Sequence, residues 1–169
     1  MKPLLIVWHS RTGAARQMAE AAVDGAAAAA AELAPEAGFA VTLKRAADAG
    51  VDDLLASGGF LFCAPENLAS LSGEMKEFFD RCYYGALDHI QGLPYACAIS
   101  AGSDGAGAAR QTERICTGWR LRAAAPALIV NLGAQTPAQI AAPKTVPAAD
   151  LERCAELGGL LAGLMLLGG

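Results

Sequence analysis

The sequence predicts an α/β protein whose parallel β-sheet is covered by helices on both faces. Short, continuous apolar runs, typical of fully buried strands, alternate with segments of helical spacing, and this β-α alternation occurs five times. The chain has 169 residues, of which 54% are hydrophobic. That size and composition suit one domain with its own core, so we expect a single domain over residues 1–169.

Five segments have the apolar composition of buried strands. They are residues 4–8, 39–43, 59–63, 95–100 and 127–132. We expect residues 64–67, after the third strand, to form a loop. Three prolines make residues 133–147, after the fifth strand, an irregular loop.

The segments between these strands have helical character. An alanine-rich stretch follows residues 10–13 and runs to about Ala34, where Pro35 and Gly38 end it. A short helix is expected at residues 52–55 and longer ones at about 106–120 and 151–165. Between the third and fourth strands, Ser72 is a candidate N-cap for a helix with one apolar stripe. The stripe consists of Met75, Phe78, Phe79 and Cys82.

Composition excludes several classes of function. A net charge of −4 does not suit nucleic-acid binding, which needs a basic face. The most apolar segment, 157–169, is shorter than the ~20 residues of a membrane span, and the N-terminus lacks the pattern of a signal peptide. The five cysteines are widely spaced without a C-x-x-C motif, which favours buried free thiols in a reducing cytoplasm. Only two histidines are present, far apart, so no metal site is expected.

The loop after the first strand is the most informative candidate site. In an open parallel sheet, ligands bind beyond the carboxyl ends of the strands. The loops after strands one, three, four and five therefore share the ligand-binding rim, whereas residues 83–92 lie at the opposite end. Hydroxyls and free N–H groups in the Ser-Arg-Thr-Gly sequence at 10–13, before a helix, suit a phosphate or a simple N-cap. Neither a P-loop nor a dinucleotide-binding glycine motif is present.

Two further stretches connect this loop to a known family. Phe-Cys-Ala-Pro-Glu-Asn-Leu at 62–68 and Leu-Ser-Gly-Glu-Met-Lys-Glu-Phe-Phe-Asp-Arg at 71–81 follow the third strand. Together with the hydroxyl-containing first loop, they resemble the flavodoxin-like NAD(P)H-dependent FMN and quinone reductases over roughly residues 4–132. The resemblance implies a flavodoxin-like three-layer sandwich with a five-stranded parallel sheet of order 2-1-3-4-5.

The resemblance also implies where FMN, the expected cofactor, would bind. Its 5′-phosphate would be held by Ser10, Arg11, Thr12, Gly13, Ala14 and Ala15. Its isoalloxazine ring would be lined by Pro65, Glu66, Asn67 and Leu68. The other edge of the ring would be approached by Ser100, Ala101, Gly102, Ser103 and Gly105. No side chain is expected to act as a catalytic acid or base, because the cofactor carries the chemistry.

The sequence departs from the family at two positions. Ala15 stands where the family often has a second hydroxyl residue, and Asn67 stands where it often has an aromatic residue that stacks on the flavin. The missing aromatic weakens a reading as a flavodoxin-type electron carrier. Two other families of this topology are excluded. The chain lacks the acidic residues of a phosphoacceptor receiver, and its first loop lacks the cysteine of a low-molecular-weight tyrosine phosphatase.

Several other residues have both a functional and a structural interpretation. His9, beside the first loop, either contacts phosphate or is structural, and Arg11 either binds phosphate or is solvated. Arg110 and Arg114 either receive NADPH or form a solvated helix face. Cys63 next to the site is expected to be inert. Trp119 is expected in the core or in an interface.

The expected function is NAD(P)H-dependent reduction of FMN, or of a quinone-like acceptor through bound FMN. NADPH or NADH would serve as a transient co-substrate, and the partner would be a small-molecule electron acceptor. The alternatives are an electron carrier without NAD(P)H activity and a flavin-free binding module. The family also implies a homodimer, because a single small domain leaves one face of the ring open.

Overall fold

A computed structural model of the chain describes residues 1–168, and its strands and helices alternate as the sequence predicts. The strands are β1 (Leu4–Trp8), β2 (Val41–Arg45), β3 (Gly59–Asn67), β4 (Ser70–Leu71), β5 (Pro94–Ala101), β6 (Arg122–Ala123) and β7 (Leu128–Asn131). The helices are α1 (Ala14–Leu33), α2 (Val51–Ala56), α3 (Gly73–Ala86), α4 (Ala106–Gly118), α5 (Pro137–Ala141) and α6 (Ala148–Leu167).

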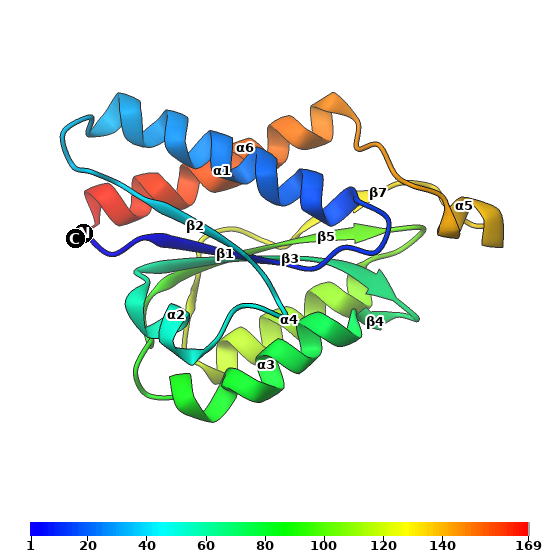
Figure 1. The fold of residues 1–169 in the computed structure, drawn as a ribbon, viewed down its shortest axis with the longest axis horizontal. Helices are drawn as coiled ribbons and strands as arrows, with labels where there is room; N and C mark the ends of the chain where they lie inside the picture. Colours follow the sequence, from blue (N-terminus) through cyan, green and yellow to red (C-terminus); the bar gives the residue numbers. More distant parts are fainter. Residues whose placement is uncertain (169) are drawn as a thin grey trace.

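The sheet has the predicted strand order. β2, β1, β3 and β5 pair side by side in parallel, and β6 and β7 pair in parallel with successive parts of the outer edge of β5. The five predicted strands thus have the order 2-1-3-4-5, which confirms the flavodoxin-like topology. Two short strands add to them, and one of these, β4, pairs antiparallel with β3. The carboxyl ends of the parallel strands point to one rim, beyond which α5 projects (Figure 1).

Helices cover both faces of the sheet, so the fold has three layers. α1 and α6 lie on one face, and α2, α3 and α4 lie on the other (Figure 1). The core under α3 and α4 is aromatic. The predicted stripe of α3 is fully buried there, and Phe79 lies 4.9 Å from Phe62 of β3, between ring centroids. Trp119 is also completely buried in this core, and its indole N–H donates to the Tyr83 carbonyl.

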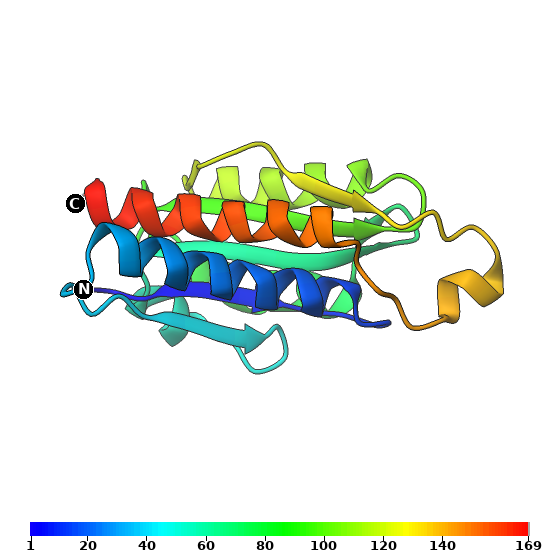
Figure 2. The same ribbon diagram turned by 90° about the horizontal axis from the view of Figure 1, so that it is seen from above.

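The opposite core, under α1 and α6, is built largely of small residues. The buried residues of α1 are all alanine except Met18. The helix backbones cross so closely that a Cβ added at Gly25 would lie 1.9 Å from the Ala155 carbonyl oxygen. A Cβ added at Gly158 would lie 2.0 Å from the Ala22 carbonyl oxygen. Alanine and glycine therefore set the distance between these two helices, which run side by side in Figure 2.

Three predicted boundaries are wrong. The second strand is β2, shifted two residues from the predicted 39–43, because this edge strand continues through the polar Lys44 and Arg45. Residues 64–67 are not a loop but the end of β3, which forms a hairpin with β4. The 133–147 segment contains α5, since Pro137 occupies the first turn of a helix with a Thr136–Gln139 capping box.

Gly158→Ala is expected to lower the free energy of unfolding by about 1–3 kcal/mol, because the added methyl group forces α6 away from α1. This loss exceeds the roughly 1 kcal/mol that alanine gains over glycine in a helix. Chemical denaturation of the variant and of the unaltered protein measures the difference in the free energy of unfolding. Gly163→Ala in the same helix is the matched control, since its Cβ would meet only a side-chain carbon of Leu33 at 3.6 Å. An equal destabilisation of both variants would contradict the close crossing.

Candidate functional site

The loop between β1 and α1 is a tight turn that leads into the helix. Its glycine, Gly13, is the N-cap of α1 and has a φ of 95°, a left-handed conformation that disfavours residues with a Cβ. The Ser10 hydroxyl oxygen accepts the Gly13 N–H at 3.0 Å and thereby closes the turn. Ala14 and Ala15 are buried, while Arg11 is exposed. The loop therefore presents backbone N–H groups and two hydroxyl residues, Ser10 and Thr12, at the rim.

The electrostatic surroundings of α1 differ from those of the other helices described in residues 1–168. α2, α3 and α6 carry an acidic residue in the first turn, and the Thr136 hydroxyl caps α5. The N-terminus of α4 receives the Glu66 carboxylate. α1 has neither an acidic residue in its first turn nor a side chain that caps it. The positive end of its dipole is thus left for an external anion, which fits a phosphate.

The predicted ring-lining residues 65–68 form the end of β3 and the turn of its hairpin. Asn67 pairs with Ser70, so the turn consists of Leu68 and Ala69 alone. Both have positive φ, 53° and 59°, which is the geometry of a type I′ turn without its usual glycine or asparagine. Leu68 is fully exposed at the tip. The hairpin therefore projects an apolar side chain from the rim.

The hairpin is fastened to α4. The Glu66 carboxylate accepts the N–H groups of Gly105 and Ala108 at 2.9 and 3.0 Å, across the N-terminus of that helix. The Gln111 side-chain oxygen accepts the Ser70 hydroxyl and the Leu71 N–H. In this structure, the Glu66 carboxylate is bound to the protein rather than directed away from it. The sequence did not predict this contact between Glu66 and α4, because 39 positions separate Glu66 from Gly105.

The loop after β5 lies next to the hairpin, because Ser100 of β5 is the register partner of Pro65 of β3. The side chains of Ser100 and Ala101 are buried, whereas Ser103 and Asp104 are exposed at the rim. Gly105 has a φ of 92°, and a Cβ at Gly102 would lie 2.5 Å from the Ala134 carbonyl oxygen. Both glycines are thus required by the fold itself, whatever ligand approaches them.

His9 is a structural link that the sequence left undecided. Its Nδ1 lies 2.8 Å from the Ser72 hydroxyl, and its Nε2 lies 3.2 Å from a carboxylate oxygen of Glu74. Because a carboxylate only accepts, we assign the neutral ring's proton to Nε2, and Ser72 then donates to Nδ1. Ser72 is the N-cap residue of α3, as predicted, but its hydroxyl engages His9 instead of the helix. His9 therefore joins the start of the first loop to α3.

The cysteines are structural. All five are buried free thiols, as predicted, and burial raises the pKa of Cys63, beside the site, well above its ordinary value. Burial also raises the pKa of Cys97 to about 12. Thiols with raised pKa values are poor nucleophiles. Residues 1–168 contain no group of three or more His, Cys, Asp or Glu side chains that suits a metal ion.

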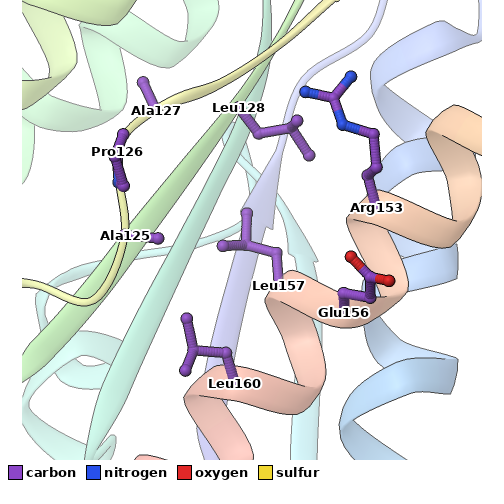
Figure 3. A pocket seen from close by; sticks show the side chains of 8 residues that line it. All are labelled: Ala125, Pro126, Ala127, Leu128, Arg153, Glu156, Leu157 and Leu160. Carbon is purple, nitrogen blue, oxygen red and sulfur yellow. The ribbon is translucent and has the colours of Figure 1, made fainter.

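One hollow in the described surface lies away from the rim. It has a volume of about 480 Å³ and lies between residues 125–128 and α6. Figure 3 shows Leu157, Leu160, Arg153 and Glu156 of α6 facing residues 125–128 across it. None of the predicted site residues lines it. The rim, where three predicted segments converge, remains the candidate site.

Arg110 and Arg114 are exposed on α4.

The fold is flavodoxin-like, and the first loop at its rim has hydroxyls and N–H groups that suit a phosphate. A family model described as NADPH-dependent FMN reductase matches residues 9–136, which is more than half of the chain. The chain therefore belongs to the NADPH-dependent FMN reductase family. FMN is the cofactor that this membership indicates, and NADPH is the family's co-substrate.

Individual flavodoxins are similar to this chain in sequence or in fold. A flavodoxin of Aquifex aeolicus is 32% identical over 101 residues, which cover 60% of this chain and half of the length of that protein. The structure of an archaeal flavodoxin superimposes with a TM-score of 0.76 at 18% identity, covering 97% of this chain and 99% of the other. A WrbA-like flavodoxin from Agrobacterium tumefaciens has a TM-score of 0.73 at 17% identity, with full coverage of both chains.

His9 predicts a pH dependence of stability. Burial lowers its pKa below the ordinary 6.5, an effect that Glu74 opposes and Arg11 reinforces. The unfolded chain therefore takes up a proton at a higher pH than the folded chain does. The contribution of His9 to the free energy of unfolding is expected to fall as the pH drops below about 6.5.

Urea denaturation between about pH 7.5 and about pH 5.5 measures this loss, and His9→Asn is expected to reduce it. His89→Asn is the control, because His89 is exposed at the other end of the sheet. That variant is expected to retain the loss. The same pH dependence in His9→Asn as in the unaltered protein would show that burial of His9 is not its cause.

Proposed function

We propose that this chain binds FMN at the rim and reduces FMN, or a quinone-like acceptor through bound FMN, at the expense of NADPH or NADH. Membership of the NADPH-dependent FMN reductase family supports the reaction class. The observation that carries the assignment of the site is the first turn of α1, which has neither an acidic nor a capping side chain. The donors there, two hydroxyls and free N–H groups, fit a phosphate.

The other two segments suit the ring of FMN. Residues 65–68 and 100–105 would lie on either side of it, with Leu68 and Pro65 as apolar contacts and the glycine-containing loop as a source of backbone N–H groups. FMN, when bound, supplies a ring that accepts a hydride from the nicotinamide and passes electrons to the acceptor. The chain's own residues hold the phosphate, orient the ring and present N–H groups that stabilise its reduced, anionic form. No side-chain acid or base is required.

A second candidate is an electron carrier that receives electrons from another protein. The likeness to flavodoxins in sequence and fold favours it. Asn67, in place of a stacking aromatic residue, supports the reductase instead. A third candidate, a module that has lost the flavin, differs from both in having no affinity for FMN.

We further infer a homodimer, in which a second copy covers the open face of the ring, and a small-molecule electron acceptor as the partner in the reaction. We place the protein in the cytoplasm, since five buried free thiols suit a reducing compartment. None of the helices within residues 1–168 combines the length and the hydropathy that a membrane span requires.

FMN is expected to bind more weakly after the double substitution Ser10→Ala with Thr12→Ala. Removing two hydrogen-bond donors from a charged phosphate should raise the Kd by at least about tenfold. Flavin fluorescence on titration with the purified protein measures it. Thr117→Ala, an exposed hydroxyl residue near the far end of α4, is the control and should retain wild-type affinity. An unchanged Kd in the double variant would show that the phosphate lies elsewhere.

NADPH is expected to be oxidised in the presence of the FMN-loaded protein and a quinone, or of the protein and excess FMN. Loss of NADPH absorbance measures the rate, with NADH assayed in parallel. A protein that holds FMN but oxidises neither nicotinamide would be an electron carrier. A colourless protein that takes up no FMN would contradict both redox functions.

A further inference from the structure

A short segment near the C-terminal helix crosses the start of α1. This segment, residues 142–147 and hereafter the strap, connects α5 to α6 and passes beside the first loop (Figure 2). The Lys144 N–H donates to the Thr12 carbonyl at 2.8 Å. The side chain of Val146 is buried in the core formed by α1 and α6. The strap is thus attached both to the first loop and to the helices behind it.

Gln17, one turn into α1, joins the strap to the loop. Its Nε2 donates to the Gly13 carbonyl at 3.0 Å and to the Lys144 carbonyl at 2.8 Å. Its Oε1 accepts the Val146 N–H at 3.0 Å. The half-buried amide therefore uses its nitrogen and its oxygen on backbone groups. Only an amide has two donor hydrogens and an acceptor in this arrangement.

These bonds help to fix the peptides of the first loop. A trans peptide is planar, so its C=O and N–H point in opposite directions. The Thr12 carbonyl is held by Lys144, and the Gly13 N–H of the same peptide points instead to the Ser10 hydroxyl oxygen. The next peptide follows the same rule. The Gly13 carbonyl accepts both the backbone N–H of Gln17, at 3.2 Å, and its side-chain Nε2, at 3.0 Å, so the Ala14 N–H of that peptide points the opposite way, at the open N-terminus of α1.

We propose that Gln17 is a positioning residue for the phosphate of FMN, and that the strap is part of the phosphate site. The inference rests on the proposed function, because it takes the first loop as the phosphate-binding loop. Gln17 holds the strap, whose Lys144 N–H bonds the Thr12 carbonyl, and adds a second donor to the Gly13 carbonyl. It thereby keeps the loop and the Ala14 N–H in place before the ligand arrives. A preorganised site avoids the entropy cost of ordering the loop on binding. Retention of FMN thus depends on a contact between residues 127 positions apart.

The test compares FMN with riboflavin, which has the same ring and ribityl chain without the phosphate. Gln17→Met keeps a side chain of similar length but removes the amide. Its Kd for FMN is expected to rise about tenfold, the effect of losing one to two hydrogen bonds. Its Kd for riboflavin is expected to stay within about twofold of wild type, because the phosphate contacts alone are lost. Flavin fluorescence titration gives both constants.

Arg16→Ala is the matched control. Arg16 neighbours Gln17 on the exposed side of α1, where it pairs with Glu20 at 2.8 Å. It is expected to leave the ratio of the two Kd values unchanged. If Gln17 has a purely structural role, Gln17→Met weakens the binding of FMN and riboflavin equally, or weakens neither. Either result would overturn the inference. Wild-type protein that binds FMN no more tightly than riboflavin would overturn the proposed phosphate site together with the inference.

Hydrogen exchange of the unaltered protein provides a measurement that does not depend on the variant folding. The amides of Lys144 and Val146 are donors in this network, so FMN should slow their exchange, whereas riboflavin should not. Equal protection by both flavins, or by neither, while FMN binds more tightly, would overturn the role of the strap and leave the phosphate loop itself in place.

Discussion

The close crossing of α1 and α6 is the constraint on which the rest of the structure depends. Gly25 and Gly158 let each helix reach the backbone of the other, which no larger side chain permits. Both helices begin at the rim of the sheet, so their crossing brings the strap beside the first loop. The short distance between α1 and α6, which the two glycines permit, thus brings the strap within hydrogen-bonding distance of Gln17. Through the strap it also affects the conformation of the first loop.

The two faces of the sheet contribute differently to the rim. The alanine-rich face positions the first loop and the strap. The aromatic face anchors α3 and α4, and those helices hold the hairpin and His9 through side-chain hydrogen bonds. The proposed flavin site lies where the two faces meet. Its phosphate end depends on the packing of small residues, and its ring end depends on polar contacts that fasten a strained turn.

The distribution of acidic side chains is the reason for which we propose the phosphate end of the site at α1. Glu66 supplies its charge to α4, although it lies on β3, and α2, α3 and α6 use acidic residues of their own. α1 and α4 both begin with a left-handed glycine and have no acidic residue in the first turn, but α4 receives the Glu66 carboxylate and α1 receives none. The chain therefore satisfies every other helix dipole internally and leaves one for a ligand.

The sequence by itself determined the existence of the five strands and the position of the first loop, since buried apolar runs and helical stripes depend on local spacing. The order of the strands followed from the resemblance to the family and is confirmed by the pairing of the strands. The ends of β2 and β3 and the presence of α5 were mispredicted, because an edge strand tolerates charge and the turn at Leu68 and Ala69 lacks a turn residue. Only the tertiary structure decided that Glu66 caps α4, that His9 bonds Ser72, and that Gln17 holds the strap. Each of these contacts joins residues far apart in the chain. Their geometry is set by how the helices pack on the sheet, which no local pattern encodes.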